Sequence, residues 1–208
     1  MEVRVLAPGL WRWTGWHEEW KQEVGCVYYE RGGEVCVIDP LVPPEDSERF
    51  WAALDRDVGR VGGSVHVLIT VFWHARSASA VVARYGARLW APSRAKAAVE
   101  RRAGVVTDPF RVGALLPVGI EAFASGRGTE VVYWLPRERA LVTGDVILGA
   151  ADGGVRLCPE SWLPAGTGHR ELRRALRPLL DLGVERIVVS HGEPVLERGG
   201  EALRVLLG

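Results

Sequence analysis

One loop of this sequence carries a histidine, an arginine and large aromatic residues directly after a predicted buried strand. The run Val65–Ile69 is apolar except for one histidine, and Phe72, Trp73, His74 and Arg76 follow it closely. Loops at the ends of buried strands are where α/β folds place catalytic and binding groups. His74 is therefore a candidate catalytic or ligand residue, although a single histidine is more often packed or solvent-facing. Trp73 and Arg76 are candidate ligand-binding residues.

Three further segments place polar groups beside predicted strands. Asp145 directly follows an apolar strand, and His191 follows another one near the C-terminus. A carboxylate or an imidazole at such a position can bind a ligand or move a proton, but a turn or a capping residue explains each of them equally well. The glycine-rich segment 124–129 contains Arg127 and has no phosphate-binding pattern, so it supports no nucleotide site.

The elements that must position these residues follow from the apolar periodicity. The order is antiparallel strands, then alternating strands and helices, then a second group of strands, and finally a helix, a strand and a helix. This order predicts two mixed sheets with helices outside them, a four-layered αββα sandwich of the α/β class. Strands are expected at 2–6, 24–30, 34–39, 65–70, 87–91, 114–124, 129–135, 139–143 and 186–190, and helices at 45–58, 77–85, 93–102, 168–181 and 199–207.

Composition limits the class of protein and its partners. The chain has 208 residues, 26 basic and 26 acidic, which predicts one domain over 1–208 and neither a nucleic-acid nor a membrane partner. The N-terminus does not have the pattern of a signal peptide, so a cytoplasmic location is expected. Cys26, Cys36 and Cys158 have no metal-binding spacing and are expected to be reduced and buried. The oligomeric state cannot be inferred.

Tryptophan is frequent, with nine residues. Four of them lie around His17, and Trp162 lies in another loop near the candidate residues. Packing in the core explains a single tryptophan best, but several together also suit the aromatic wall of a ligand pocket. His17 and Trp162 are therefore candidate ligand-binding residues.

Taken together, these segments resemble the metallo-β-lactamase superfamily over nearly the whole chain. Val37-Ile38-Asp39-Pro40 resembles that family's early strand with its aspartate. Tyr133-Trp134-Leu135-Pro136 through Gly144-Asp145 resembles its W-L-P…T-G-D segment, whose aspartate bridges two metals. Ser190-His191-Gly192-Glu193-Pro194 resembles its last ligand motif. The resemblance implies the αββα fold and a hydrolase-like protein.

The first ligand motif of the family, T-H-x-H-x-D-H, is where this sequence departs from it. Counted from Thr70, the four ligand positions hold Val71, Trp73, Ala75 and Arg76. A shift of one residue would let His74 stand for the second histidine, with Arg76 and Ser77 in place of the Asp-His pair, so the register stays open. The mid-chain histidine ligand of the family falls on Gly126. The resemblance therefore predicts a degenerate site without two zinc ions.

Three functions remain open on this basis. The leading one is a hydrolase-like protein, or pseudoenzyme, that has lost most of its dinuclear zinc site and keeps a pocket for a small ligand. The second is an active hydrolase of esters, thioesters or amides with one zinc or iron at His74, Asp145 and His191. The third is a non-catalytic binding or structural module. If the metals are lost, we expect Arg76 or Arg127 to supply the positive charge beside Asp145, which suits an anionic or carbonyl-bearing ligand.

Overall fold

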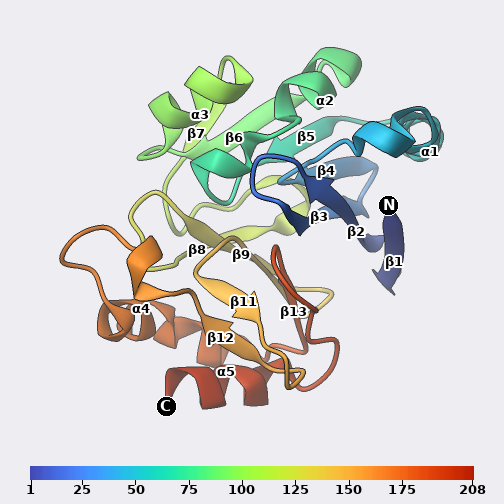
Figure 1. Cartoon of the computed structure of the whole chain (residues 1–208). Helices are drawn as coiled ribbons and strands as arrows, with labels where there is room; N and C mark the ends of the chain where they lie inside the picture. The colour runs from blue at the N-terminus through green and yellow to red at the C-terminus, as the bar shows by residue number, and fades with distance from the viewer. The chain divides into compact units, whose positions relative to one another are not determined.

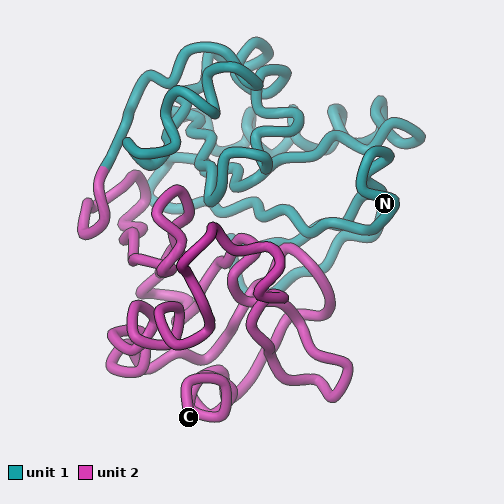
Figure 2. Tube along the Cα trace, turned by 60° about the vertical axis from the view of Figure 1, so that its left-hand side comes forward, with its two compact units in different colours: residues 1–110 teal, residues 111–208 magenta.

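The computed structural model describes all residues from 1 to 208, in two compact units, residues 1–110 and 111–208 (Figure 2). Each unit pairs one main sheet with helices (Figure 1). The mixed sheets and flanking helices agree with the predicted α/β class. The expectation that the two units form one domain stays a prediction. No helix is both long and apolar enough to cross a membrane.

Unit 1 contains a seven-stranded sheet in the order β1 to β7. Strands β1 to β4 pair antiparallel, and β4 to β7 pair parallel. Helix α1 contacts β4, and helices α2 and α3 contact β6 (Figure 1). The strands are β1 (Glu2–Ala7), β2 (Leu10–His17), β3 (Gln22–Arg31), β4 (Glu34–Ile38), β5 (Val65–Leu68), β6 (Arg88–Pro92) and β7 (Asp108–Phe110), and the helices are α1 (Ser47–Val61), α2 (Ala78–Tyr85) and α3 (Lys96–Ala103), with 3-10 turns η1 (Pro44–Asp46) and η2 (Phe72–Ala75).

Unit 2 contains a four-stranded sheet in the order β13-β10-β9-β8 and a small sheet of β11 and β12. β10 pairs parallel with β13 and antiparallel with β9, so this sheet is also mixed. The strands are β8 (Glu121–Ala124), β9 (Val131–Leu135), β10 (Ala140–Thr143), β11 (Ile147–Gly149), β12 (Val155–Leu157) and β13 (Arg186–Val189), and the helices are α4 (His169–Leu176) and α5 (Gly199–Leu207), with 3-10 turns η3 (Pro117–Gly119), η4 (Glu160–Trp162) and η5 (Arg177–Asp181).

Each unit has its own apolar core. In unit 1, β-branched residues of the central strands, such as Val37 and Val67, pack against helix residues that include Phe50 and Val81. In unit 2, Leu141 and Ile187 of the sheet pack with Leu172 and Leu203 of the two helices. Burial of this kind is the main stabilising contribution in a domain of this size.

One predicted strand was too long, and four strands, β2, β7, β11 and β12, were not predicted. The strand expected over 114–124 is limited to β8, because Pro117 removes a backbone donor and Gly119 turns the chain with φ +78°. Strand β2 was not predicted. Most of its residues are buried, so it lacks the polar–apolar alternation of a strand with one wet face. Trp13 of β2 is a core residue whose indole nitrogen donates to the Leu41 carbonyl, 2.9 Å away.

Candidate functional site

In unit 1, a buried hydrogen-bond network holds His74. Asp39 follows β4 and adopts φ +52°, a conformation that an aspartate tolerates better than most residues. One carboxylate oxygen of Asp39 lies 2.8 Å from His74 Nδ1, and accepts from the Thr70 hydroxyl at 2.5 Å. The other accepts from the Thr70 backbone amide at 2.8 Å. His74 and Thr70 are fully buried, and Asp39 nearly so.

This network fixes which nitrogen of His74 can act on a ligand. A carboxylate accepts hydrogen bonds only, so Nδ1 of His74 carries the proton that it donates to Asp39. Nε2 is then the nitrogen that can bind a metal or a ligand, and a histidine supported by a carboxylate in this way is typical of metal sites. Asp39 was not among the predicted site residues, although its position after a buried strand was a usable signal.

Arg76 lies at the end of the same loop in a strained conformation, with φ +23° and ψ −105°. Its guanidinium donates to the Asp39 carbonyl at 3.2 Å and stands over the ring of Trp20, 5.3 Å from the centroid. The Trp20 ring stacks on His17 with centroids 3.9 Å apart. Two predicted ligand-binding residues, Arg76 and His17, thus contact the same indole. Trp73, the third predicted ligand-binding residue of unit 1, packs edge-on against Phe72.

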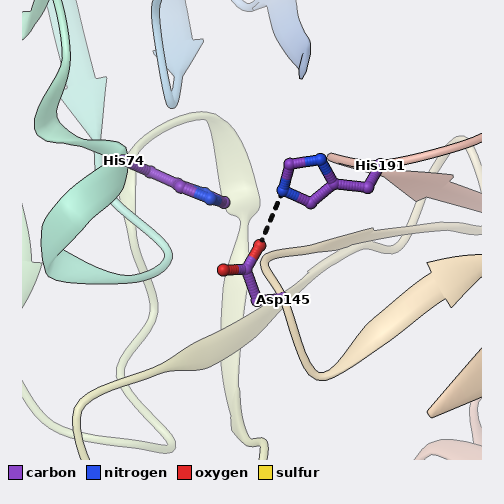
Figure 3. A group of neighbouring side chains, drawn as sticks. All are labelled: His74, Asp145 and His191. Carbon is purple, nitrogen blue, oxygen red and sulfur yellow. Dashed lines mark ion pairs between the residues drawn. The ribbon is translucent and has the colours of Figure 1, made fainter. Parts of the chain in front are cut away.

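In unit 2, Asp145 and His191 contact each other. His191 Nε2 lies 3.1 Å from Asp145 Oδ1 (Figure 3). Strands β10 and β13 are parallel neighbours, and their last residues, Thr143 and Val189, are paired. Asp145 and His191 each follow one of these strands by two residues, so both lie at the same end of the sheet. Trp162 reaches this pair as well, with its ring 6.4 Å from that of His191 and 44% of the residue exposed.

The backbone around His191 is held by a close approach of two glycines. A Cβ atom at Gly149 would lie 2.7 Å from the Glu193 nitrogen, and one at Gly192 would lie 3.0 Å from Gly149 Cα. The Gly149 amide donates to the carbonyl of His191 at 2.9 Å. The two glycines therefore let β11 pack directly against the chain that carries the imidazole.

A buried ion pair, Arg127 with Glu130, contacts the backbone of Asp145. Arg127 donates to Glu130 Oε2 at 2.9 Å and to the Trp162 carbonyl at 2.6 Å. Glu130 Oε1 accepts from the backbone amides of Asp145 and Val146, at 2.7 and 2.8 Å. Sequence reasoning identified Arg127 but missed Glu130, because a lone glutamate at the start of a strand carries no signal.

The sequence analysis predicts that Arg76 or Arg127 supplies positive charge beside Asp145. Arg127 is buried and pairs with Glu130, whose other carboxylate oxygen accepts from the backbone amide of Asp145. Direct pairing of Arg76 or Arg127 with the Asp145 carboxylate stays a hypothesis.

Gly126, at the mid-chain ligand position of the resemblance, is closed to any side chain. It adopts φ +93°, and a Cβ atom there would lie 2.9 Å from Leu172 Cδ2 and 3.0 Å from Leu172 Cα. Both contacts come from helix α4, one of them from its backbone. A histidine therefore does not fit at this position without a shift of the helix.

The residues that could bind a metal ion are few and of two kinds, histidine and aspartate. His74, Asp145 and His191, labelled in Figure 3, each offer one atom of the kind that binds a metal, an imidazole nitrogen or a carboxylate oxygen. The cysteines offer little, because all three are free and buried, as predicted, and burial raises the pKa of Cys26 to about 11. A thiol held neutral is a poor ligand.

Comparison with solved structures identifies the fold. A metallo-beta-lactamase from Pontibacter korlensis is similar over 99% of this chain and 98% of its own, with a TM-score of 0.73 and 16% identity. The DIM-1 metallo-beta-lactamase matches with a TM-score of 0.72 and 14% identity over 98% and 97% of the two chains. A metallo beta lactamase from Erythrobacter litoralis, solved with beta mercaptoethanol in its active site, matches with a TM-score of 0.67 and 16% identity over 98% of this chain and 96% of its own.

No protein-family model matches the sequence, and no curated protein matches it either. The structural likeness nevertheless extends over almost the full length of both chains. This chain therefore has the metallo-β-lactamase fold, an α/β sandwich, which confirms the predicted fold class.

Proposed function

We propose that this chain is a hydrolase-like protein of the metallo-β-lactamase fold that has lost the two-zinc centre and binds a small ligand at Asp145 and His191. The observation that carries the proposal is the closure of position 126. A ligand side chain there is excluded by helix α4, and the neighbouring Arg127 is engaged by Glu130. Loss of the mid-chain ligand therefore involves the packing of helix α4 against position 126 as well as the replacement of one residue.

The first-motif loop supports the same proposal. In the register counted from Thr70, two of the ligand positions hold Val71 and Ala75, both fully buried apolar residues. Arg76, at the last position, is a cation whose guanidinium donates to the Asp39 carbonyl. None of these side chains can coordinate zinc, because zinc takes thiolate, imidazole or carboxylate ligands.

The ligand chemistry that we propose follows from the groups around His191. Trp162 offers an aromatic surface that is partly exposed, and the imidazole of His191 can donate to an acceptor. We therefore propose a small ligand with a carboxylate or a carbonyl group.

A second candidate function, a hydrolase with one metal, is favoured by the orientation of His74. Asp39 contacts Nδ1 of His74, so the ring is turned with Nε2 away from Asp39, and His74, Asp145 and His191 are the two histidines and one carboxylate that we propose as donors. The 3.1 Å between His191 Nε2 and Asp145 Oδ1 is also close to the ~3.3 Å edge of a zinc tetrahedron with ~2 Å bonds. A metal held there would supply an activated water for hydrolysis of an ester, thioester or amide.

In that case the residues of the chain would have separate tasks. Asp39 would keep the His74 ring oriented through its Nδ1 proton, and Glu130 would hold the backbone of Asp145. The guanidinium of Arg76 would orient a carbonyl or carboxylate of the substrate.

The test combines metal titration with thermal unfolding. Protein purified without chelator is titrated with zinc, and separately with a series of carboxylates from formate to hexanoate. Under the leading proposal, carboxylates raise the melting temperature of the wild type and not of Trp162→Ala or His191→Ala, and zinc has little effect. Saturable binding of one zinc that His74→Ala abolishes would favour the second candidate. Binding of two zinc ions would refute both.

A further inference from the structure

The Arg127–Glu130 pair is a buried pair of charges to which the proposed function assigns no ligand. The two side chains are 2% and 0% exposed, so both charges have left water. Desolvation of two charges is costly, and a pair of this kind needs nearly every donor and acceptor to be satisfied. A buried ion pair often contributes little net stability compared with apolar residues, which raises the question of what else it does.

Both carboxylate oxygens of Glu130 are engaged. Oε2 accepts from the guanidinium of Arg127, and Oε1 accepts from two consecutive backbone amides, those of Asp145 and Val146. A carboxylate that accepts two amides fixes the direction in which that peptide segment runs. The Thr143 hydroxyl closes the same turn by donating to the Ile147 carbonyl at 2.9 Å.

The loop that carries the pair is itself locked. The Ser125 hydroxyl donates to the Glu130 carbonyl at 2.9 Å, and it accepts from the Arg127 amide at 3.1 Å. Gly126 packs against Leu172 of helix α4. Glu130 therefore connects two loops, β8–β9 and β10–β11, and both of them carry ligand positions in the resemblance.

We propose that Glu130, braced by Arg127, is a positioning residue that holds Asp145 against His191 and so takes over, without a metal, the link that a bound ion would make between these two loops. The proposal deepens the proposed function and rests on it for the loss of the metals. Its geometric part, the hold of Glu130 on the Asp145 loop, is measured separately from metal content.

The variants are chosen to separate the carboxylate from the charge pair. Glu130→Ala removes the acceptor and leaves Arg127 buried without its partner. Glu130→Gln keeps one carbonyl oxygen for the two amides. The double variant Arg127→Met with Glu130→Leu removes both charges and the acceptor while keeping side-chain volume, and such replacements of buried pairs are commonly tolerated. Glu121→Ala, in the neighbouring strand β8, is the matched control.

The experiment is amide hydrogen exchange at Asp145 and Val146, read by NMR together with the imidazole nitrogen signals of His191. In the wild type we expect both amides to be protected and unaffected by EDTA. Glu130→Ala and the double variant should raise the exchange rates of both amides at least about tenfold, as expected for loss of a buried hydrogen bond. Because Glu130 binds the Asp145 loop, we expect the same variants to change the imidazole signals of His191 through that loop. Glu130→Gln should restore part of the protection, and Glu121→Ala should change nothing.

The opposing outcomes are equally specific. Unchanged exchange at both amides in folded Glu130→Ala, or in the double variant if Glu130→Ala does not fold, would overturn the positioning role. A rise in exchange when EDTA is added to the wild type would show that a metal holds the loops. If two metals were found while Glu130→Ala still released the loop, the proposed function would fail and the role of Glu130 would stand.

Discussion

Replacement of Gly126 tests whether the mid-chain ligand position is closed or merely vacant. The residue has φ +93°, and a Cβ atom would approach Leu172 Cδ2 to 2.9 Å, Leu172 Cα to 3.0 Å and Ala175 Cβ to 3.3 Å. A side chain in a left-handed conformation costs about 1–2 kcal/mol. Overpacking against helix α4 adds about 1–3 kcal/mol. Gly126→Ala should therefore reduce the free energy of unfolding by about 2–5 kcal/mol.

Gly153 provides the matched control for this prediction. It also has a positive φ, +85°, but a Cβ atom there would meet nothing within 4 Å. Gly153→Ala should lose only the conformational part, about 1–2 kcal/mol. The difference between the two variants then measures the contact with helix α4.

The assay is urea unfolding followed by tryptophan fluorescence, with Gly126→His added to restore the ligand of the resemblance. Gly126→His should be at least as unstable as Gly126→Ala and should bind no more zinc than the wild type. If Gly126→Ala and Gly153→Ala lose the same free energy, helix α4 does not close the position. If Gly126→His gains a tightly bound zinc, the argument for a lost site is wrong.

Three further predictions concern unit 1. Because Arg76 has φ +23°, Arg76→Gly should be more stable than Arg76→Ala by about 1 kcal/mol, and equal melting temperatures would show that the backbone carries no strain. Asp39→Asn should lower stability by about 1–3 kcal/mol and shift the His74 imidazole signals in NMR; unchanged signals would contradict the proposed orientation. Burial raises the pKa of Cys26 from 9.0 to about 11, so its contribution to stability is complete below pH 9 and is lost as the pH rises toward 11; Cys26→Ala should flatten this alkaline decline in unfolding titrations, and an identical decline would refute it.

The sequence allowed the fold to be predicted because its strongest signals are local. The buried runs around Val67 and Val188 have strand character, and the glycine at position 86, with φ +62°, ends helix α2 in the left-handed conformation that favours glycine. Strand β2 escaped prediction because its burial on both faces depends on neighbouring strands and is not written in its own periodicity. Long-range packing decided that element.

The candidate site was predictable only where a residue follows a strand. His74, Asp145 and His191 were selected in this way, and the parallel pairing of β10 with β13 brings the last two into contact in the structure. Asp39 and Glu130 act through partners that are 35 and 15 residues away in the sequence. Such partners are brought together by the fold, so the sequence could mark Asp39 only by its position after a strand and gave no signal for Glu130.

Native mass spectrometry with a zinc titration tests the central claim most directly, because it counts the ions bound to each folded chain. Protein expressed in zinc-supplemented medium and purified without chelator is measured as isolated and after addition of excess zinc, beside the His191→Ala variant. The account predicts that no folded species carries two specifically bound zinc ions under either condition. A folded wild-type species with two zinc ions, which His191→Ala reduces in number, would contradict it.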